Sequence, residues 1–118
     1  MVYRDADLNS YSESALAASG YKVGKSSDLS EGKRRELLSD IFEYELDSAL
    51  IETHGEVVGS PWSGKRLSYM ASMIAYNVRM RKLNDPVKYA VAISDWESDL
   101  CFLKTTYYDG GYWPTTDI

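Results

Sequence analysis

The fold is decided by the stretch SPWSGKRLSYMASMIAYNVRMRKLN, residues 60–84. Read at helical pitch, it carries two apolar stripes on roughly opposite faces, whereas a surface helix needs only one. The first stripe consists of Leu67, Met70, Ala71, Ile74 and Val78. The second stripe consists of Tyr69, Met73, Tyr76, Met80 and Leu83. Such a helix is either covered on both sides by its own chain or offers one side to a partner.

A second long helix is predicted over 86–107, with Asp85 as its N-cap and Pro86 as its first residue. The short turn between the two segments makes them antiparallel neighbours. The later helix carries a well-phased apolar stripe formed by Tyr89, Ile93, Trp96, Leu100, Leu103 and Tyr107. We therefore expect an all-α fold, a compact bundle of four or five helices built around the antiparallel pair 60–84 and 86–107.

Shorter helices are predicted before this pair. One covers 12–19 and is ended by Gly20, and an amphipathic one follows Ser30 as N-cap and runs to about residue 44. A third covers 47–53 and is closed by Gly55, and Ser60 is the predicted N-cap of the long helix. The whole chain, 1–118, is predicted to form a single domain with irregular ends at 1–9 and 109–118, the aromatic residues of the second end folding back onto the bundle.

Length and composition place the chain among ordinary globular domains. It has 118 residues, 44% of them hydrophobic and 26% charged, which suffices for a core without disulfide or metal cross-links. No apolar run approaches the roughly 18 residues of a membrane span, and the first residues lack a signal-peptide pattern. We therefore expect a cytoplasmic protein that does not bind membranes. Cys101 and His54 are the single residues of their types, which excludes an internal disulfide and a structural zinc site.

Charge is segregated along the chain. The net charge is −5, and residues 36–59 hold seven carboxylates and no base. Residues 60–84 hold five bases and no carboxylate, and residues 21–35 are also net basic. Such blocks indicate two electrostatically distinct surfaces, unless neighbouring helices neutralise each other.

Catalytic patterns are weak. Gly59 to Lys65 has the glycine spacing of a phosphate-binding loop, but Arg66 stands where a magnesium-binding Ser or Thr is required. Asp95, Glu97 and Asp99 alternate on a helix, where they cannot converge on one cation, so they are expected on a solvated flank. Cys101 is expected in the core. We expect no enzyme activity, no catalytic residue, no metal and no cofactor.

Three surfaces are candidates for binding. A row of carboxylates at helical spacing, which could imitate a phosphate backbone and enter a basic groove of a partner, comprises Glu36, Asp40, Glu43 and Asp47. The amphipathic members of the second stripe, expected at the edge of the core within reach of a partner, are Tyr69, Tyr76 and Met80. The candidate nucleic-acid contacts are Lys33, Arg34, Arg35, Lys65, Arg66, Arg79, Arg81 and Lys82.

Five segments together resemble a small helical domain of uncharacterised bacterial and phage proteins. They are Gly20 to Gly24, Glu31 to Leu38, Gly59 to Leu67, Asn84 to Pro86 and Asp95 to Tyr108. The resemblance covers residues 20–108 and assigns no catalytic residue. That domain often ends longer chains with nuclease or helicase modules, so the resemblance implies an accessory role near nucleic-acid machinery. A copy without such a module is similar to the small proteins that phages use against host nucleases and CRISPR complexes.

The expected function is therefore a non-enzymatic, phage-borne interaction protein. It would act in the host cytoplasm by binding and modulating a nuclease-type nucleoprotein complex. Two alternatives remain open at this point. One is a nucleic-acid-binding accessory domain that uses the basic residues of 22–35 and 65–82. The other is a homodimer in which the second stripe of 60–84 pairs with its copy.

Overall fold

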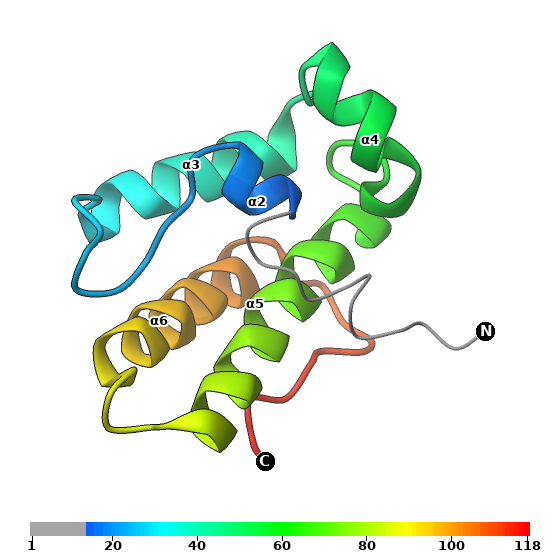
Figure 1. Ribbon diagram of the computed structural model, residues 1–118. Coiled ribbons are helices and arrows are strands. Elements are labelled where there is room, and N and C mark those ends of the chain that lie inside the picture. The colour runs from blue at the N-terminus through cyan, green and yellow to red at the C-terminus, as the bar shows by residue number, and fades with distance from the viewer. Residues whose placement is uncertain (1–13) are drawn as a thin grey trace.

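The computed structural model describes residues 14–118, and within this range all of its regular elements are helices, which confirms the predicted all-α class (Figure 1). The predicted irregular end at 1–9 lies outside the described residues. The two long helices α5 and α6 run side by side in opposite directions, with α3 and α4 packed against α5. The described helices are α2 (Ala15–Ala18), α3 (Glu31–Glu43), α4 (Ser48–Val58), α5 (Gly64–Asn84) and α6 (Ala90–Tyr107).

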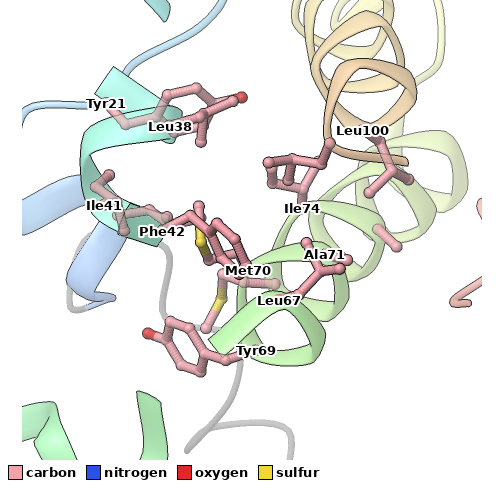
Figure 2. Close-up of a cluster of buried hydrophobic side chains, with 14 of the residues drawn as sticks. Tyr21, Leu38, Ile41, Phe42, Leu67, Tyr69, Met70, Ala71, Ile74 and Leu100 are labelled. Carbon is pink, nitrogen blue, oxygen red and sulfur yellow. The ribbon is translucent and has the colours of Figure 1, made fainter. Parts of the chain in front are cut away.

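Helix α5 is the centre of the core. The first of its apolar stripes is buried, with Ile74 and Val78 fully covered. The second is buried over most of its length, with Met73 2% exposed, but its last residue, Leu83, is 64% exposed. Figure 2 shows the side chains of α5 facing those of α3 and the loop before it. The stripe predicted on α6 supplies the other side of the core, with Trp96 and Leu103 almost completely buried. The chain itself therefore covers both faces of α5 except at the C-terminal end of the second stripe.

The helix ends follow the predicted signals in part. Ser30 accepts a hydrogen bond from the backbone N–H of Lys33, as an N-cap does, and Gly20 adopts the left-handed conformation (φ 98°) that ends α2. The prediction that Gly55 closes the third helix is wrong. Helix α4 continues through it and ends at Gly59, whose φ is 83°.

Both long helices begin later than predicted. Ser63, not Ser60, caps α5 by accepting from the N–H of Arg66, because Trp62 has a φ of 62° and interrupts helical geometry before it. Asp85 does accept from the N–H of Lys88, but residues 86–89 form turns, and the regular helix α6 begins only at Ala90. The boundaries 60–84 and 86–107 are therefore four residues too long at their N-terminal ends.

The segment after α6 is irregular, as predicted, and lies against the bundle. Pro114 is buried, and the ring of Trp113 is 5.0 Å from that of Tyr108. Its backbone accepts hydrogen bonds from the end of α5: Arg79 donates to the carbonyl of Thr115 at 2.6 Å. Charged side chains of the basic block thus hold the C-terminal segment in place.

Candidate interaction surface

One buried arginine fixes the geometry where α3, α4 and α5 meet. Arg66 is 1% exposed, and its guanidinium donates to the carbonyls of Ile41 (2.6 Å), Tyr44 (3.1 Å) and Gly59 (2.6 Å and 3.1 Å). The last carbonyls of a helix have no partner within the helix, so Arg66 supplies donors to carbonyls at the C-terminal ends of α3 and α4. Burial lowers the pKa of Arg66, while the nearby carboxylate of Glu45 acts in the opposite direction. The corner of the molecule that Arg66 organises is therefore rigid.

This corner carries most of the acidic block. Five of its carboxylate side chains belong to exposed residues, and we call them the acidic end: Asp40, Glu45, Asp47, Glu52 and Glu56. Four of them line two neighbouring grooves that share Glu45 and Leu46 in their walls, and the fifth, Glu52, is exposed on α4 one turn before Glu56. The groove between α3 and α4 has a volume of about 380 Å³, and the groove between α4 and the start of α5 has about 560 Å³. Lys65 is the exposed base at the second groove.

Large apolar side chains are exposed on the same helices and connections, and two of them, Tyr44 and Ile51, line the grooves beside the carboxylates. Tyr44 is 63% exposed and Trp62 62%, and helix α4 exposes Ile51 and Val57 at about half of their surfaces. Helix α4 buries only Val58. Exposed aromatic residues next to charged ones are typical of protein–protein interfaces, where Trp and Tyr contribute much of the binding energy.

Trp62 holds its exposed position at an energetic cost. A left-handed conformation costs a non-glycine residue about 1–2 kcal/mol. The backbone N–H of Trp62 donates to the carbonyl of Phe42 at 3.0 Å, and its ring meets those of Phe42 and Tyr107 edge-on at 5.2 and 5.6 Å. One edge of the indole is thus fixed while most of its surface faces solvent. Strained residues of this kind are concentrated at functional sites.

The predicted acidic row does not form one straight line. Helix α3 ends at Glu43, and Asp47 lies beyond it, where it caps α4 by accepting from the N–H of Leu50. Glu36 is exposed and lies 3.6 Å from Lys33. Glu43 is half-buried and accepts a 2.5 Å hydrogen bond from the hydroxyl of Tyr107. Burial, together with this hydrogen bond, raises the pKa of Tyr107 to about 12. Asp40 and Asp47 are the members of the row that belong to the acidic end.

Two of the predicted nucleic-acid contacts are interior residues. Arg34 is 6% exposed and pairs with Asp99, its Nε lying 2.7 Å from the carboxylate. Arg66 is committed to backbone carbonyls, as described above. The expectation that Arg34 and Arg66 face a phosphate backbone is therefore wrong, because their guanidinium groups already have partners inside the fold.

Other basic residues of the predicted patch are engaged within the chain. Lys82 donates to the carbonyl of Thr116 and pairs with Glu97 at 3.0 Å, while Arg79 holds the C-terminal segment. Each of these cations has an intramolecular partner that a phosphate would have to displace.

The remaining four predicted basic contacts have varied surroundings. Lys33 and Arg35 face carboxylates of their own helix, the second at 3.0 Å from Glu31. Lys65 is exposed beside the acidic end. Arg81 lies over the ring of Tyr89, with its guanidinium carbon 5.1 Å from the ring centre. The eight residues therefore do not form one open basic face.

Asp99 is the functional group that sequence reasoning misplaced most clearly. It is 0% exposed and accepts from the hydroxyl of Tyr21 at 2.6 Å and from two nitrogens of Arg34. Asp95 is partly buried, 3.7 Å from Arg34, and accepts from the N–H of Gly24. The expectation of a solvated flank is wrong for both. Asp99 follows Trp96 by three residues and precedes Leu103 by four, so it lies on the same face of the helix as the apolar stripe. This spacing was the sequence signal that Asp99 would be buried.

The apolar residues predicted for a partner lie inside the bundle. Tyr69 and Tyr76 are each 9% exposed, and Met80 is half-buried. The hydroxyl of Tyr69 accepts from the N–H of Ala15, and burial raises the pKa of Tyr69. Leu83 is the one member of this stripe that is largely exposed, at 64%, so the stripe does not offer a continuous apolar face to a partner or to a second copy of the chain.

Cys101 is exposed on the outer face of α6, which corrects the expectation that it belongs to the core. Among residues 14–118, no group of three His, Cys, Asp or Glu side chains is placed to hold a metal ion. Over the same residues, no helix is both long and apolar enough to cross a membrane.

No protein-family model, curated protein or solved structure matches this chain. A proposal about function therefore depends on the chemistry of its surfaces.

Proposed function

We propose that this protein is a non-enzymatic binding protein that places its acidic end against a basic, nucleic-acid-binding surface of a partner protein. The observation that carries the proposal is the combination of the five acidic-end carboxylates with the exposed aromatic rings of Tyr44 and Trp62. Carboxylates attract a basic surface and orient the approach, whereas aromatic rings provide buried contact area. Both rings leave more than 60% of their residue surface exposed, which is available as contact area for a partner.

The partner is defined by complementary chemistry. Proteins that bind nucleic acid expose Lys and Arg side chains at the spacing of phosphates. The rigid corner at Arg66 holds five carboxylates on two neighbouring helices and the connections between them, which suits such a surface. A protein bound there would compete with DNA or RNA. We therefore propose that the partner is a nuclease-type nucleoprotein complex, of the CRISPR or another defence class, which the protein inhibits or modulates.

The setting of this function follows from the resemblance to bacterial and phage helical domains. An acidic protein that blocks a host nuclease is useful to a phage, so a phage origin and action in the host cytoplasm belong to the same proposal. A non-catalytic role is part of the proposal as well. A Cys–His catalytic pair would require the two side chains to meet, but His54 is on α4 and Cys101 is on α6, and α5 lies between these helices in Figure 1.

A direct nucleic-acid role is less well supported by the surface. Arg34 and Arg66 are buried, and Arg79 and Lys82 have partners within the chain. The acidic end presents the opposite charge to phosphate. We therefore place the nucleic-acid contact on the partner and not on this protein.

The test is a displacement assay with purified RNA-guided nuclease complexes loaded with labelled target DNA. We expect the protein to release the DNA and to inhibit cleavage, and to do so less effectively as salt increases. A triple variant, Glu45→Lys/Glu52→Lys/Glu56→Lys, should abolish the effect, and Trp62→Gly should weaken it at least about tenfold. Asp109→Lys, an exposed carboxylate on the C-terminal segment, is the matched control.

Two results would contradict the proposal. One is inhibition that the triple variant leaves unchanged, which would place the contact elsewhere. The other is direct, salt-sensitive binding of the protein itself, in the absence of the nuclease, to a closed circular DNA, which has no strand end; such binding would favour the nucleic-acid alternative.

A further inference from the structure

A second concave site lies away from the acidic end. The 23–26 turn, the end of α5 and the start of α6 enclose a groove of about 340 Å³, which is within the range of small-molecule sites. It shares no lining residue with the two acidic grooves. Its chemically distinctive lining residues are Lys25, Arg81, Lys88, Tyr89 and Trp96.

The charge of this groove is uncompensated. Lys25, Arg81 and Lys88 line it, and no carboxylate does. Within residues 14–118, none of these three cations has a carboxylate oxygen within 4 Å. By contrast, Lys82, one position from Arg81, is paired with Glu97. Three unpaired cations around one concavity attract an anion.

Arg81 gives the groove a flat, cationic surface. Its guanidinium carbon is 5.1 Å from the ring centre of Tyr89 and 5.8 Å from that of Trp96, and the Nζ of Lys88 is 5.3 Å from the Tyr89 ring. A guanidinium held against aromatic rings is planar and weakly hydrated, so a further planar group can stack on it. Nucleic-acid bases are recognised by such stacking on arginine and aromatic side chains.

The wall of the groove is fixed before any ligand arrives. The N–H of Gly24 donates to Asp95 at 3.0 Å, and Asp95 also faces the buried Arg34. Gly24 has a φ of 94°, and a Cβ placed on it would lie 3.4 Å from the Cβ of Ala92, so the turn lies close against α6. A site held in this way does not have to be ordered when a ligand binds, which favours affinity.

We propose that this groove binds a nucleoside phosphate, with the base at the Arg81 platform and the phosphate between the exposed ammonium groups of Lys25 and Lys88. The ammonium groups of Lys25 and Lys88 account for the phosphate, and the planar Arg81 platform accounts for the base. An acidic peptide would need cations spread along an extended surface, whereas these three surround one compact cavity. The nucleotide is either free or the terminal residue of a strand, which presents the same chemistry.

The test is isothermal titration calorimetry of the full chain with adenosine 5′-monophosphate. We expect saturable binding with one site. A Lys25→Gln/Lys88→Gln double variant should weaken it at least about tenfold, as should Arg81→Met, because charged hydrogen bonds and stacking are lost. Lys104→Gln is the matched control, because the Lys104 ammonium also lies over aromatic rings but outside the groove. It should leave binding unchanged. A single-stranded oligonucleotide distinguishes the two sources of the nucleotide. If it binds more tightly than adenosine 5′-monophosphate, the groove takes the terminal residue of a strand.

Several outcomes would overturn the proposal. They are no saturable binding of the mononucleotide, equal binding of adenosine or of inorganic phosphate alone, equal loss in Lys104→Gln, and displacement of the nucleotide by a glutamate-rich peptide at lower concentration. If Arg81→Met does not fold, as judged by circular dichroism, the double variant decides, because both of its lysines are exposed.

Discussion

Removing the charge of Asp99 while keeping its shape should destabilise the fold severely. In an Asp99→Asn variant the guanidinium of Arg34, whose side chain is 7% exposed, loses the carboxylate that lies 2.7 Å from its Nε. Breaking a buried ion pair by removing one partner costs about 3–5 kcal/mol. The carboxylate of Asp95, at 3.7 Å, and the carbonyl of Leu29, at 3.5 Å, compensate in part. We therefore expect the lower end of the range, about 3 kcal/mol.

This loss is a large fraction of the total stability, since domains of this size are stable by about 5–15 kcal/mol. In urea denaturation followed by circular dichroism, the midpoint should fall by about 1–3 M at unchanged slope. Asp109→Asn is the control for an exposed carboxylate and should change stability by less than about 0.5 kcal/mol.

A double variant tests whether the stability lost in Asp99→Asn comes from the unpaired charge of Arg34. Arg34→Met/Asp99→Asn removes the unpaired cation and leaves an amide oxygen for the hydroxyl of Tyr21. It should unfold at a higher urea concentration than Asp99→Asn alone, because an apolar replacement of a buried pair is often nearly neutral. The reasoning is refuted if Asp99→Asn leaves the midpoint unchanged, or if the double variant is no more stable than the single one.

Three further changes test the geometry of the bundle. Gly59→Ala should lower the free energy of unfolding by about 1–3 kcal/mol, since φ 83° is strained for alanine and the new Cβ would lie 2.9 Å from a side-chain atom of Lys65. Gly64→Ala is the matched control: its Cβ would meet nothing within 4 Å, so it should raise the free energy of unfolding by about 0.4–1 kcal/mol. Thermal melts of both variants measure the two effects. Arg66→Lys should lower the free energy of unfolding, measured in urea, by about 2–3 kcal/mol, because one ammonium cannot replace a guanidinium fork that donates to three carbonyls. A variant as stable as the wild type would disprove this role of Arg66. The pKa of Tyr107 is raised from 10 to about 12, so the phenol stabilises the fold below pH 10 and loses this contribution as pH rises through 12. The stability difference between wild type and Tyr107→Phe should accordingly narrow between pH 9 and pH 11.5, and a constant difference would contradict the argument.

The sequence was sufficient for the helices and for much of the core. Apolar periodicity located α5 and α6, and the caps at Ser30 and Gly20 were read correctly because capping depends on a few neighbouring residues. The start of α5 was misplaced because the left-handed Trp62 has no local signal: a tryptophan rarely adopts this conformation, and only its contacts with residues 42 and 107 maintain it.

The charged groups were harder to place for a related reason. Arg34 and Asp99 are 65 positions apart, so nothing near either residue indicates the other. A charged residue is usually solvated, which is why a solvent-facing position was predicted for both. The position of each within an apolar stripe was the better guide: Arg34 lies four residues before Leu38, and Arg66 lies four before Met70. The acidic character of residues 36–59 was evident from composition, but its division between exposed and bonded carboxylates required the tertiary structure.

The ion pair of Arg34 and Asp99 also sets a condition on when the chain can fold during translation. At a synthesis rate of about 5–20 residues per second, the 65 residues between the two groups take roughly 3–13 s to make. Until α6 leaves the ribosome, the guanidinium of Arg34 has no Asp99 to enter the interior with. During this interval, burial of Arg34 would leave its charge unpaired, so we expect α3 to dock in its final position only after α6 has been synthesised.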